Sequence, residues 1–207
     1  VSPAASCPPE IEEAKRDPSR RFGKYVLGAE IGRGGMGIIY RAWQEDLARW
    51  VALKILRPEA GRTATGRFLQ EGKLAARVTH PHLVPIYEVS QEKDVPYLAM
   101  ALLEGGSLDG RTLPVREALE TMVPVAMAVE EIHRHGIVHR DIKPANLLLD
   151  REGRVHLGDF GLAKALEEDI RLSASGTMLG TVSFAPPEQI LGRRDDVGPR
   201  SDVYALG

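Results

Sequence analysis

The amino-acid sequence predicts an α+β protein with two lobes, the first rich in strands and the second mostly helical. Three observations lead to this fold class. Short apolar runs with strand-like alternation fill most of residues 25–103, and one amphipathic helix pattern at 65–78 interrupts them. A longer helical pattern covers residues 115–135. Between the two halves, Glu104-Gly105-Gly106-Ser107 has the composition of a hinge.

Composition excludes several classes of protein. The chain has 207 residues, of which 43% are hydrophobic and 27% charged, as is typical of a globular protein with one sizeable core or two small lobes. A net charge of -2 argues against a nucleic-acid or anionic-membrane partner. The single cysteine, Cys7, cannot form a disulfide framework, and no apolar run approaches the ~20 residues of a membrane span. We therefore expect a cytoplasmic segment without membrane contact.

Residues 1–21 contain several prolines and a run of charges from Glu10 to Asp17, with few bulky apolar side chains. Such a composition does not bury enough apolar surface to offset chain entropy. We expect this segment to be a disordered leader without chemistry of its own.

Two predicted strands, Tyr25–Ile31 and Ile38–Trp43, flank a glycine-rich segment. Gly32, Gly34 and Gly37 have the G-x-G-x-x-G spacing, which lets backbone N–H groups approach phosphate oxygens. A dinucleotide-binding fold would continue into a helix, whereas here the chain continues as a strand. The pattern favours a hairpin that covers a nucleotide, and an ordinary glycine-rich turn is the alternative.

Lys54 lies in a third predicted strand, on the face opposite Val51 and Leu53. Burial of an ammonium group is costly unless the group is paired. Glu71, in the predicted helix 65–78, is the best candidate partner. Gly72 beside it weakens that helix by up to ~1 kcal/mol, which we interpret as possible mobility of the helix. The alternatives are a lysine on an edge strand and a solvated glutamate.

The helix ends at His80-Pro81-His82, which indicates a turn more strongly than a metal site. Two strands, 83–90 and 95–103, lead to the hinge. The helix 115–135 then carries a core-facing apolar stripe, and Pro124 in its interior is expected to kink or split it.

The segment His139–Asn146 combines a carboxylate, an ammonium and a carboxamide at short spacing, ahead of the apolar run Leu147–Leu149. Asp141 is suited to take or orient a proton, and Asn146 to offer its carbonyl oxygen to a hard cation. Lys143 is suited to neutralise a phosphate between them. The alternative is a charged surface turn before a strand.

One predicted hairpin later, Gly158-Asp159-Phe160-Gly161 offers a second carboxylate, suited to a metal ion that bridges phosphates. Residues 162–181 form a loop with several hydroxyl side chains, and the chain then reaches Pro186-Pro187-Glu188. The hydroxyl residues of this loop are Ser173, Ser175, Thr177 and Thr181.

Together these motifs resemble those of bacterial eukaryotic-like (Hanks-type) serine/threonine protein kinases, from about residue 25 to residue 207. The resemblance implies a bilobal protein kinase-like fold, with an N-lobe at about 22–103 and a C-lobe at about 104–207. It also implies that the domain is truncated in its central helix. Asp202 opens that helix and braces the backbone of the catalytic loop, residues 139–146. Lys143 and Thr181 favour serine/threonine over tyrosine specificity.

The resemblance assigns ATP and Mg²⁺ as cofactors. Lys54, held by Glu71, fixes the α- and β-phosphates, while Asn146 and Asp159 hold the metal. The loop over the phosphates comprises Gly32, Arg33, Gly34, Gly35, Met36 and Gly37. The adenine site comprises Ile31, Ile39, Ala52, Met100, Ala101, Leu103 and Leu148.

The implied catalytic residues are Asp141, Lys143, Lys54 and Glu71, with Asp141 accepting the hydroxyl proton and Lys143 steadying the γ-phosphate. The implied reaction transfers the ATP γ-phosphate to serine or threonine hydroxyls of protein substrates, including another copy of the kinase. A phosphorylated hydroxyl in residues 162–181 would pair with Arg140 and order that loop. Two alternatives stay open. One is an inactive fragment or pseudokinase that acts as a binding module, and the other is a small-molecule phosphotransferase, a class that generally lacks the loop lysine.

Overall fold

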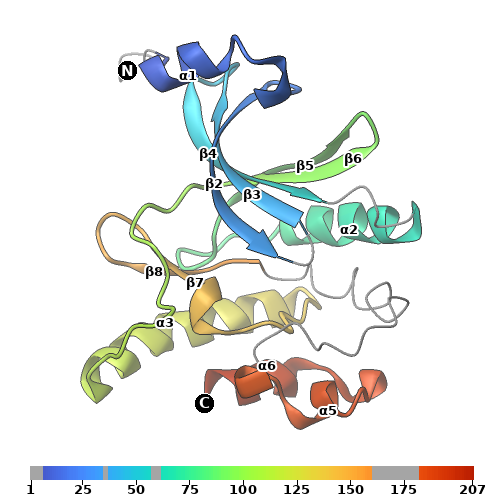
Figure 1. Ribbon diagram of the computed structural model, residues 1–207. Coiled ribbons are helices and arrows are strands. Elements are labelled where there is room, and N and C mark those ends of the chain that lie inside the picture. The colour runs from blue at the N-terminus through green and yellow to red at the C-terminus, as the bar shows by residue number, and fades with distance from the viewer. Residues whose placement is uncertain (1–6, 35–36, 57–61, 160–181) are drawn as a thin grey trace.

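The computed structural model describes residues 7–34, 37–56, 62–159 and 182–207, which form two lobes (Figure 1). The N-lobe is a six-stranded antiparallel sheet in the order β1-β2-β3-β4-β6-β5. Its elements are α1 (Pro9–Ala14), η1 (Pro18–Arg20), β1 (Arg21–Phe22), β2 (Tyr25–Gly34), β3 (Gly37–Gln44), β4 (Arg49–Leu56), α2 (Arg62–Ala75), β5 (Ile86–Glu92) and β6 (Val95–Met100).

The second lobe is mostly helical, with one two-stranded hairpin of β7 and β8. Its elements are α3 (Val115–Arg134), η2 (Pro144–Asn146), β7 (Leu147–Leu149), β8 (Val155–Leu157), η3 (Val182–Phe184), α5 (Pro187–Ile190), η4 (Arg194–Asp196) and α6 (Pro199–Leu206). The predicted α+β class and the two-lobed arrangement are confirmed. Among the described helices, none is both long and apolar enough to cross a membrane.

The glycine-rich segment closes a hairpin between β2 and β3, as expected. Gly34 pairs with Gly37 at the end next to the turn, and β3 pairs along its whole length with β4. A Cβ added at Gly37 would lie 2.2 Å from the carbonyl oxygen of Ile55 in β4. The third glycine of the motif therefore lets β3 and β4 approach closely. Gly35 and Met36 lie outside the described residues.

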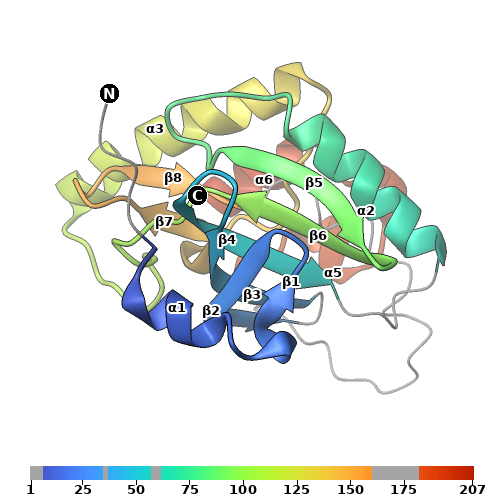
Figure 2. The ribbon, with the colours of Figure 1, turned by 90° about the horizontal axis from the view of Figure 1, so that it is seen from above.

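Helix α2 lies alongside β5, as both ribbon views show (Figures 1 and 2). Gly72 is buried at this contact, and a Cβ there would lie 2.8 Å from Cγ1 of Val89. The structure thus gives Gly72 a packing role, because it lets the helix carrying Glu71 approach the sheet closely.

The two lobes are joined by backbone hydrogen bonds as well as by the hinge. Gly105 N–H donates to the Leu149 carbonyl at 2.9 Å. Val84 N–H donates to the Leu157 carbonyl at 3.0 Å, and Leu157 N–H donates to the His82 carbonyl at 2.8 Å. These bonds attach the β7–β8 hairpin to the segment before β5 and to the hinge.

Helix α3 runs without a break from Val115 to Arg134, so Pro124 does not split it. Val125, Val129 and Ile132 are buried as predicted. Because these apolar residues pack into the core after the proline, their burial offsets the one backbone hydrogen bond that Pro124 removes.

The expectation of a disordered leader is wrong for residues 7–21, which the structure places against the N-lobe. In α1, Ile11 and Ala14 are 1% and 6% exposed. They pack in one apolar cluster with Val26 of β2 and Trp43 of β3. The spacing of three between Ile11 and Ala14 puts both on one helix face, but composition alone does not reveal the site on the sheet that receives them.

Charged contacts add to this docking. Glu10 in α1 accepts a hydrogen bond from Arg41 Nη1 at 2.7 Å. The guanidinium of Arg41 in turn lies 3.6 Å above the ring of Trp50, so its charge is held between a carboxylate and an aromatic face. Helix α1 is therefore attached to the N-lobe sheet by both apolar and charged contacts.

We predict that Ile11→Ala lowers the free energy of unfolding by about 2–4 kcal/mol, because it leaves a cavity between α1 and the sheet. Denaturant unfolding measures this change. Glu13→Ala, at an exposed position of the same helix, is the matched control and should change stability by less than about 0.5 kcal/mol. Equal effects of the two substitutions would contradict the docking of α1.

Candidate active site

Residues 139–146, which correspond to the catalytic loop of the resemblance, lie between α3 and β7 and bring three of the predicted residues together. Asn146 Nδ2 donates to the backbone carbonyl of Asp141 at 2.6 Å and to its Oδ2 at 3.0 Å. Lys143 Nζ lies 2.8 Å from the same Oδ2. The short helix η2 produces this geometry, because it turns the chain back within the five residues from Asp141 to Asn146.

A second charged pair forms where β4 meets the segment after β8. Lys54 Nζ lies 2.8 Å from Oδ1 of Asp159, and the lysine is only 5% exposed. Burial by itself would raise the pKa of Asp159, but the adjacent ammonium outweighs it, and the pKa of Asp159 is lowered. The carboxylate is therefore ionised at neutral pH. The sequence predicted that both residues lie around one nucleotide cleft, and the structure adds that they form a direct ion pair.

Glu71 occupies a partly buried position on α2 and has interactions of its own. In this structure the ion pair of Lys54 is with Asp159. The pairing of Lys54 with Glu71 stays a prediction.

His139 joins the two carboxylate-bearing segments and is fully buried. Its Nε2 lies 2.9 Å from the carbonyl oxygen of Gly158, and its Nδ1 accepts the N–H of Asp141 at 3.2 Å. Burial lowers the pKa of His139, so the ring is neutral, with its proton on Nε2. The ring thereby connects the backbone N–H of Asp141 to the carbonyl of Gly158, the residue before Asp159.

Asp202 at the start of α6 fixes the catalytic loop from the other side, as the resemblance implies. It is 1% exposed and accepts the backbone N–H groups of His139 and Arg140, each at 2.8 Å. The sequence did not single out His133 of α3, whose Nε2 lies 2.7 Å from the same carboxylate. These contacts satisfy a buried charge and fix the position of the loop.

Most of the predicted adenine site forms one apolar cluster between the lobes. Ala52 and Met100 are buried in it. Partly buried residues from β3, the hinge and β7 pack against them, namely Ile39, Ala101, Leu103 and Leu148. Ile31 is set apart, because it is 50% exposed near the end of β2.

The remaining predicted residues lie in or near the glycine-rich hairpin. Gly32, Gly34 and Gly37 are in the paired part of β2 and β3. Arg33 forms an ion pair with Glu30 of its own strand. Phe160 and the loop hydroxyls Ser173, Ser175, Thr177 and Thr181 lie outside the described residues.

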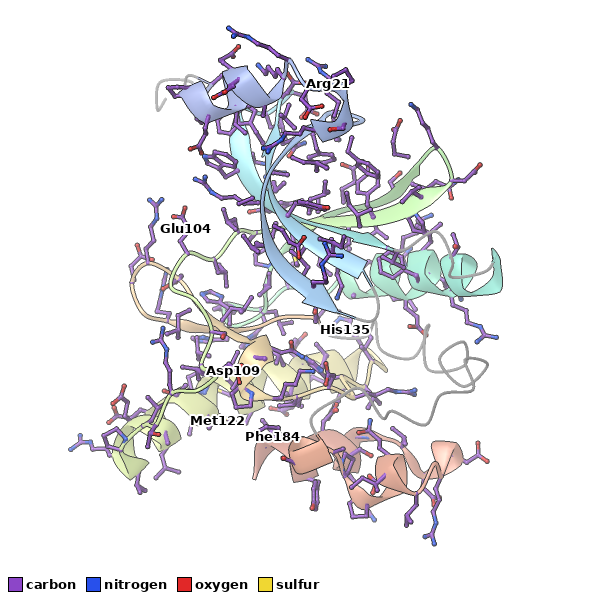
Figure 3. All side chains as sticks on the ribbon, viewed as in Figure 1. Arg21, Glu104, Asp109, Met122, His135 and Phe184 are labelled. Atoms are coloured by element: carbon purple, nitrogen blue, oxygen red, sulfur yellow. The ribbon has the colours of Figure 1, made fainter. Side chains whose placement is uncertain are left out.

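A pocket borders the catalytic loop on the side of the C-terminal helices. Its walls are the loop itself, the segment before α5 and the first turns of α6. Figure 3 labels Phe184, where the chain approaches those helices. The lining residues are Arg140, Asp141, Ile142, Lys143, Phe184, Ala185, Pro186, Gln189, Ser201, Asp202 and Ala205.

The predicted magnesium ligands fit a hard cation. Asp159 offers carboxylate oxygens. The amide nitrogen of Asn146 donates hydrogen bonds to Asp141, so the side-chain oxygen of Asn146 is left to face a cation. Two protein ligands are few, but magnesium usually keeps several waters and completes its shell with substrate phosphates.

Comparison with known proteins gives the family. The protein kinase domain family matches residues 25–207, so the chain belongs to the protein kinase family. It is 37% identical over 203 residues to the probable serine/threonine-protein kinase SCO3848 of Streptomyces coelicolor, covering 92% of this chain and 30% of that protein. It is 39% identical over 193 residues to the DNA damage-responsive serine/threonine-protein kinase RqkA of Deinococcus radiodurans, covering 89% and 29%.

Among solved structures, the fold is similar to the PknI kinase domain of Mycobacterium tuberculosis, with a TM-score of 0.70 and 30% identity. That match covers 90% of this chain and 72% of the solved one. The chain thus spans less than a third of the first two curated relatives but most of a kinase domain.

We predict that Lys54→Met destabilises the protein by about 1–3 kcal/mol at pH 7.5, because the partly buried Asp159 keeps its charge while its inaccessible Oδ1 atom loses the ammonium partner. In the parent the pKa of Asp159 is lowered, so the stability from the pair is present above the ordinary aspartate pKa of about 3.9 and is lost as pH falls through the lowered value. In the variant, burial raises the pKa of Asp159, so the penalty shrinks on acidification.

Denaturant unfolding of parent and variant at pH 7.5 and pH 5 measures the difference. Lys73→Met, on the exposed face of α2, is the control and should show no such pH dependence. If Lys54→Met lowered the free energy of unfolding by the same amount at both pH values, the ion pair would be ruled out as the source of the loss.

Proposed function

We propose that this chain is the catalytic part of an ATP-dependent serine/threonine protein kinase. The observation that carries the proposal is the joining of two charged clusters by His139. One cluster is Asp141 with Lys143 and Asn146, and the other is Lys54 with Asp159. The predicted catalytic positions are all filled by residues of the required type, which favours catalysis over the pseudokinase alternative.

The N-lobe binds the nucleotide in this proposal. The apolar cluster around Ala52 and Met100 receives adenine, and the β2–β3 hairpin covers the phosphates. Lys54 donates to the α- and β-phosphates, as its buried position at the lobe junction allows. Magnesium, held by Asn146 and Asp159, supplies neutralisation of the phosphate charge when it is bound.

The catalytic loop acts on the protein hydroxyl. Asp141 orients the hydroxyl and accepts its proton, while Asn146 holds the carboxylate through its amide nitrogen. Lys143, which pairs with Asp141 in this structure, turns to the γ-phosphate when ATP is present. Most of the rate enhancement comes from positioning and charge neutralisation.

The substrate in this proposal is a protein, and the pocket beside Asp141 marks where the segment that carries the reacting hydroxyl would lie. Apolar residues such as Phe184 and Pro186 and polar residues such as Gln189 line this pocket together. A second copy of the kinase is one such substrate, through the hydroxyls of residues 162–181. Since the reaction consumes ATP, we place this segment in the cytoplasm.

We predict that Asp141→Asn lowers the rate of phosphate transfer at least 100-fold, because the proton acceptor is lost, while ATP affinity changes less than about threefold. Transfer of labelled phosphate to a protein substrate and binding of a fluorescent ATP analogue measure the two effects. Asp109→Asn, on an exposed loop of the same lobe (Figure 3), is the control and should leave both unchanged. If ATP affinity fell as much as the rate of phosphate transfer, Asp141 would be a nucleotide-binding residue and not the proton acceptor.

A further inference from the structure

The backbone of Arg140, one residue before Asp141, is held on both sides of its Cα atom. Arg140 has a φ of 68°, in the left-handed region that non-glycine residues rarely adopt. Its N–H donates to Oδ1 of Asp202 at 2.8 Å, and its carbonyl accepts a hydrogen bond from Nε2 of Gln189 at 2.9 Å. Such a conformation persists only when surrounding contacts hold it.

Gln189 belongs to α5, the helix that follows one wall of the substrate pocket. Its own N–H donates to the carbonyl of Pro186 at 3.0 Å, and Pro186 lines the pocket. The side chain of Gln189 lines the pocket as well and crosses to the catalytic loop. One residue therefore links the wall of the pocket to the residue that precedes the proposed proton acceptor.

The other end of this arrangement is anchored on α6. Ser201 is 1% exposed, and its hydroxyl donates to Oε1 of Glu188, the neighbour of Gln189. This hydrogen bond lowers the pKa of Glu188 and favours its charged form. Because Ser201 and Asp202 are adjacent, the first turn of α6 fixes both α5 and the catalytic loop, and Gln189 closes the ring between them.

We propose that Gln189 is a positioning residue for the protein substrate. Its amide sets the position of the Pro186 wall relative to Asp141, so that a bound segment presents its hydroxyl to the carboxylate. This proposal rests on the kinase function proposed above. A change at Gln189 should affect the protein substrate and not ATP, because the proposed ATP contacts in the N-lobe and at Asp159 lie on other elements of the chain.

The test is a kinetic comparison of two Gln189 variants with the parent. Gln189→Met keeps the length of the side chain and removes the donor. We expect kcat/KM for a protein substrate to fall about five- to tenfold, as the net contribution of one hydrogen bond implies, while KM for ATP stays within twofold. Gln189→Lys keeps an N–H donor and should recover at least half of the lost kcat/KM. Gln91→Met, at an exposed position of β5, is the matched control.

Thermal unfolding, measured alongside, separates positioning from a structural role. A melting temperature within about 2 °C of the parent, with a selective loss toward the protein substrate, supports the proposal. Unchanged kinetics in Gln189→Met, parallel changes in both KM values, or no recovery in Gln189→Lys would each overturn it. A parent protein without any phosphate transfer would instead overturn the proposed function.

Discussion

The ion pair between Lys54 and Asp159 is the constraint on which the arrangement of the site depends. A lysine that is 5% exposed at the junction of two lobes requires a counter-charge, and Asp159 provides it from the opposite lobe. The β3–β4 and β4–β6 pairings fix the position of Lys54 along its strand. The β7–β8 hairpin fixes Asp159, so the pair couples the register of the sheet to the relative position of the lobes.

In the second lobe, buried polar groups fix the position of the catalytic loop. His139 and Asp202 are both almost inaccessible to water, and each is fully engaged with backbone groups of neighbouring segments. Buried polar networks of this kind are costly when incomplete, so they define one geometry rather than several. The loop can therefore hold Asp141 and Asn146 in place before any substrate is bound.

Sequence reasoning located the long strands of the N-lobe, helices α2 and α3 and the β7–β8 hairpin, because their signals are local, but it missed α1, β1 and α5. Strand alternation, the glycine spacing and the composition of His139–Asn146 can be read within a few residues. The errors arose where a partner is distant in the chain. Ile11 has an ordinary polar neighbourhood in sequence, yet it docks on Val26 and Trp43. Gly72 suggested a weak helix, whereas its position against Val89 shows a packing requirement.

By itself the sequence determined the fold class, the identity of the charged residues at the site and the resemblance to protein kinases, since each depends on residue type and short spacing. Only the tertiary structure decided the individual contacts: the ion pair of Lys54 with Asp159, the contact of His133 with Asp202, and the hydrogen bond from Gln189 to the carbonyl of Arg140. The physical reason is that these contacts join segments up to about a hundred residues apart. Their geometry is set by the packing of whole elements, and neither spacing nor composition records it.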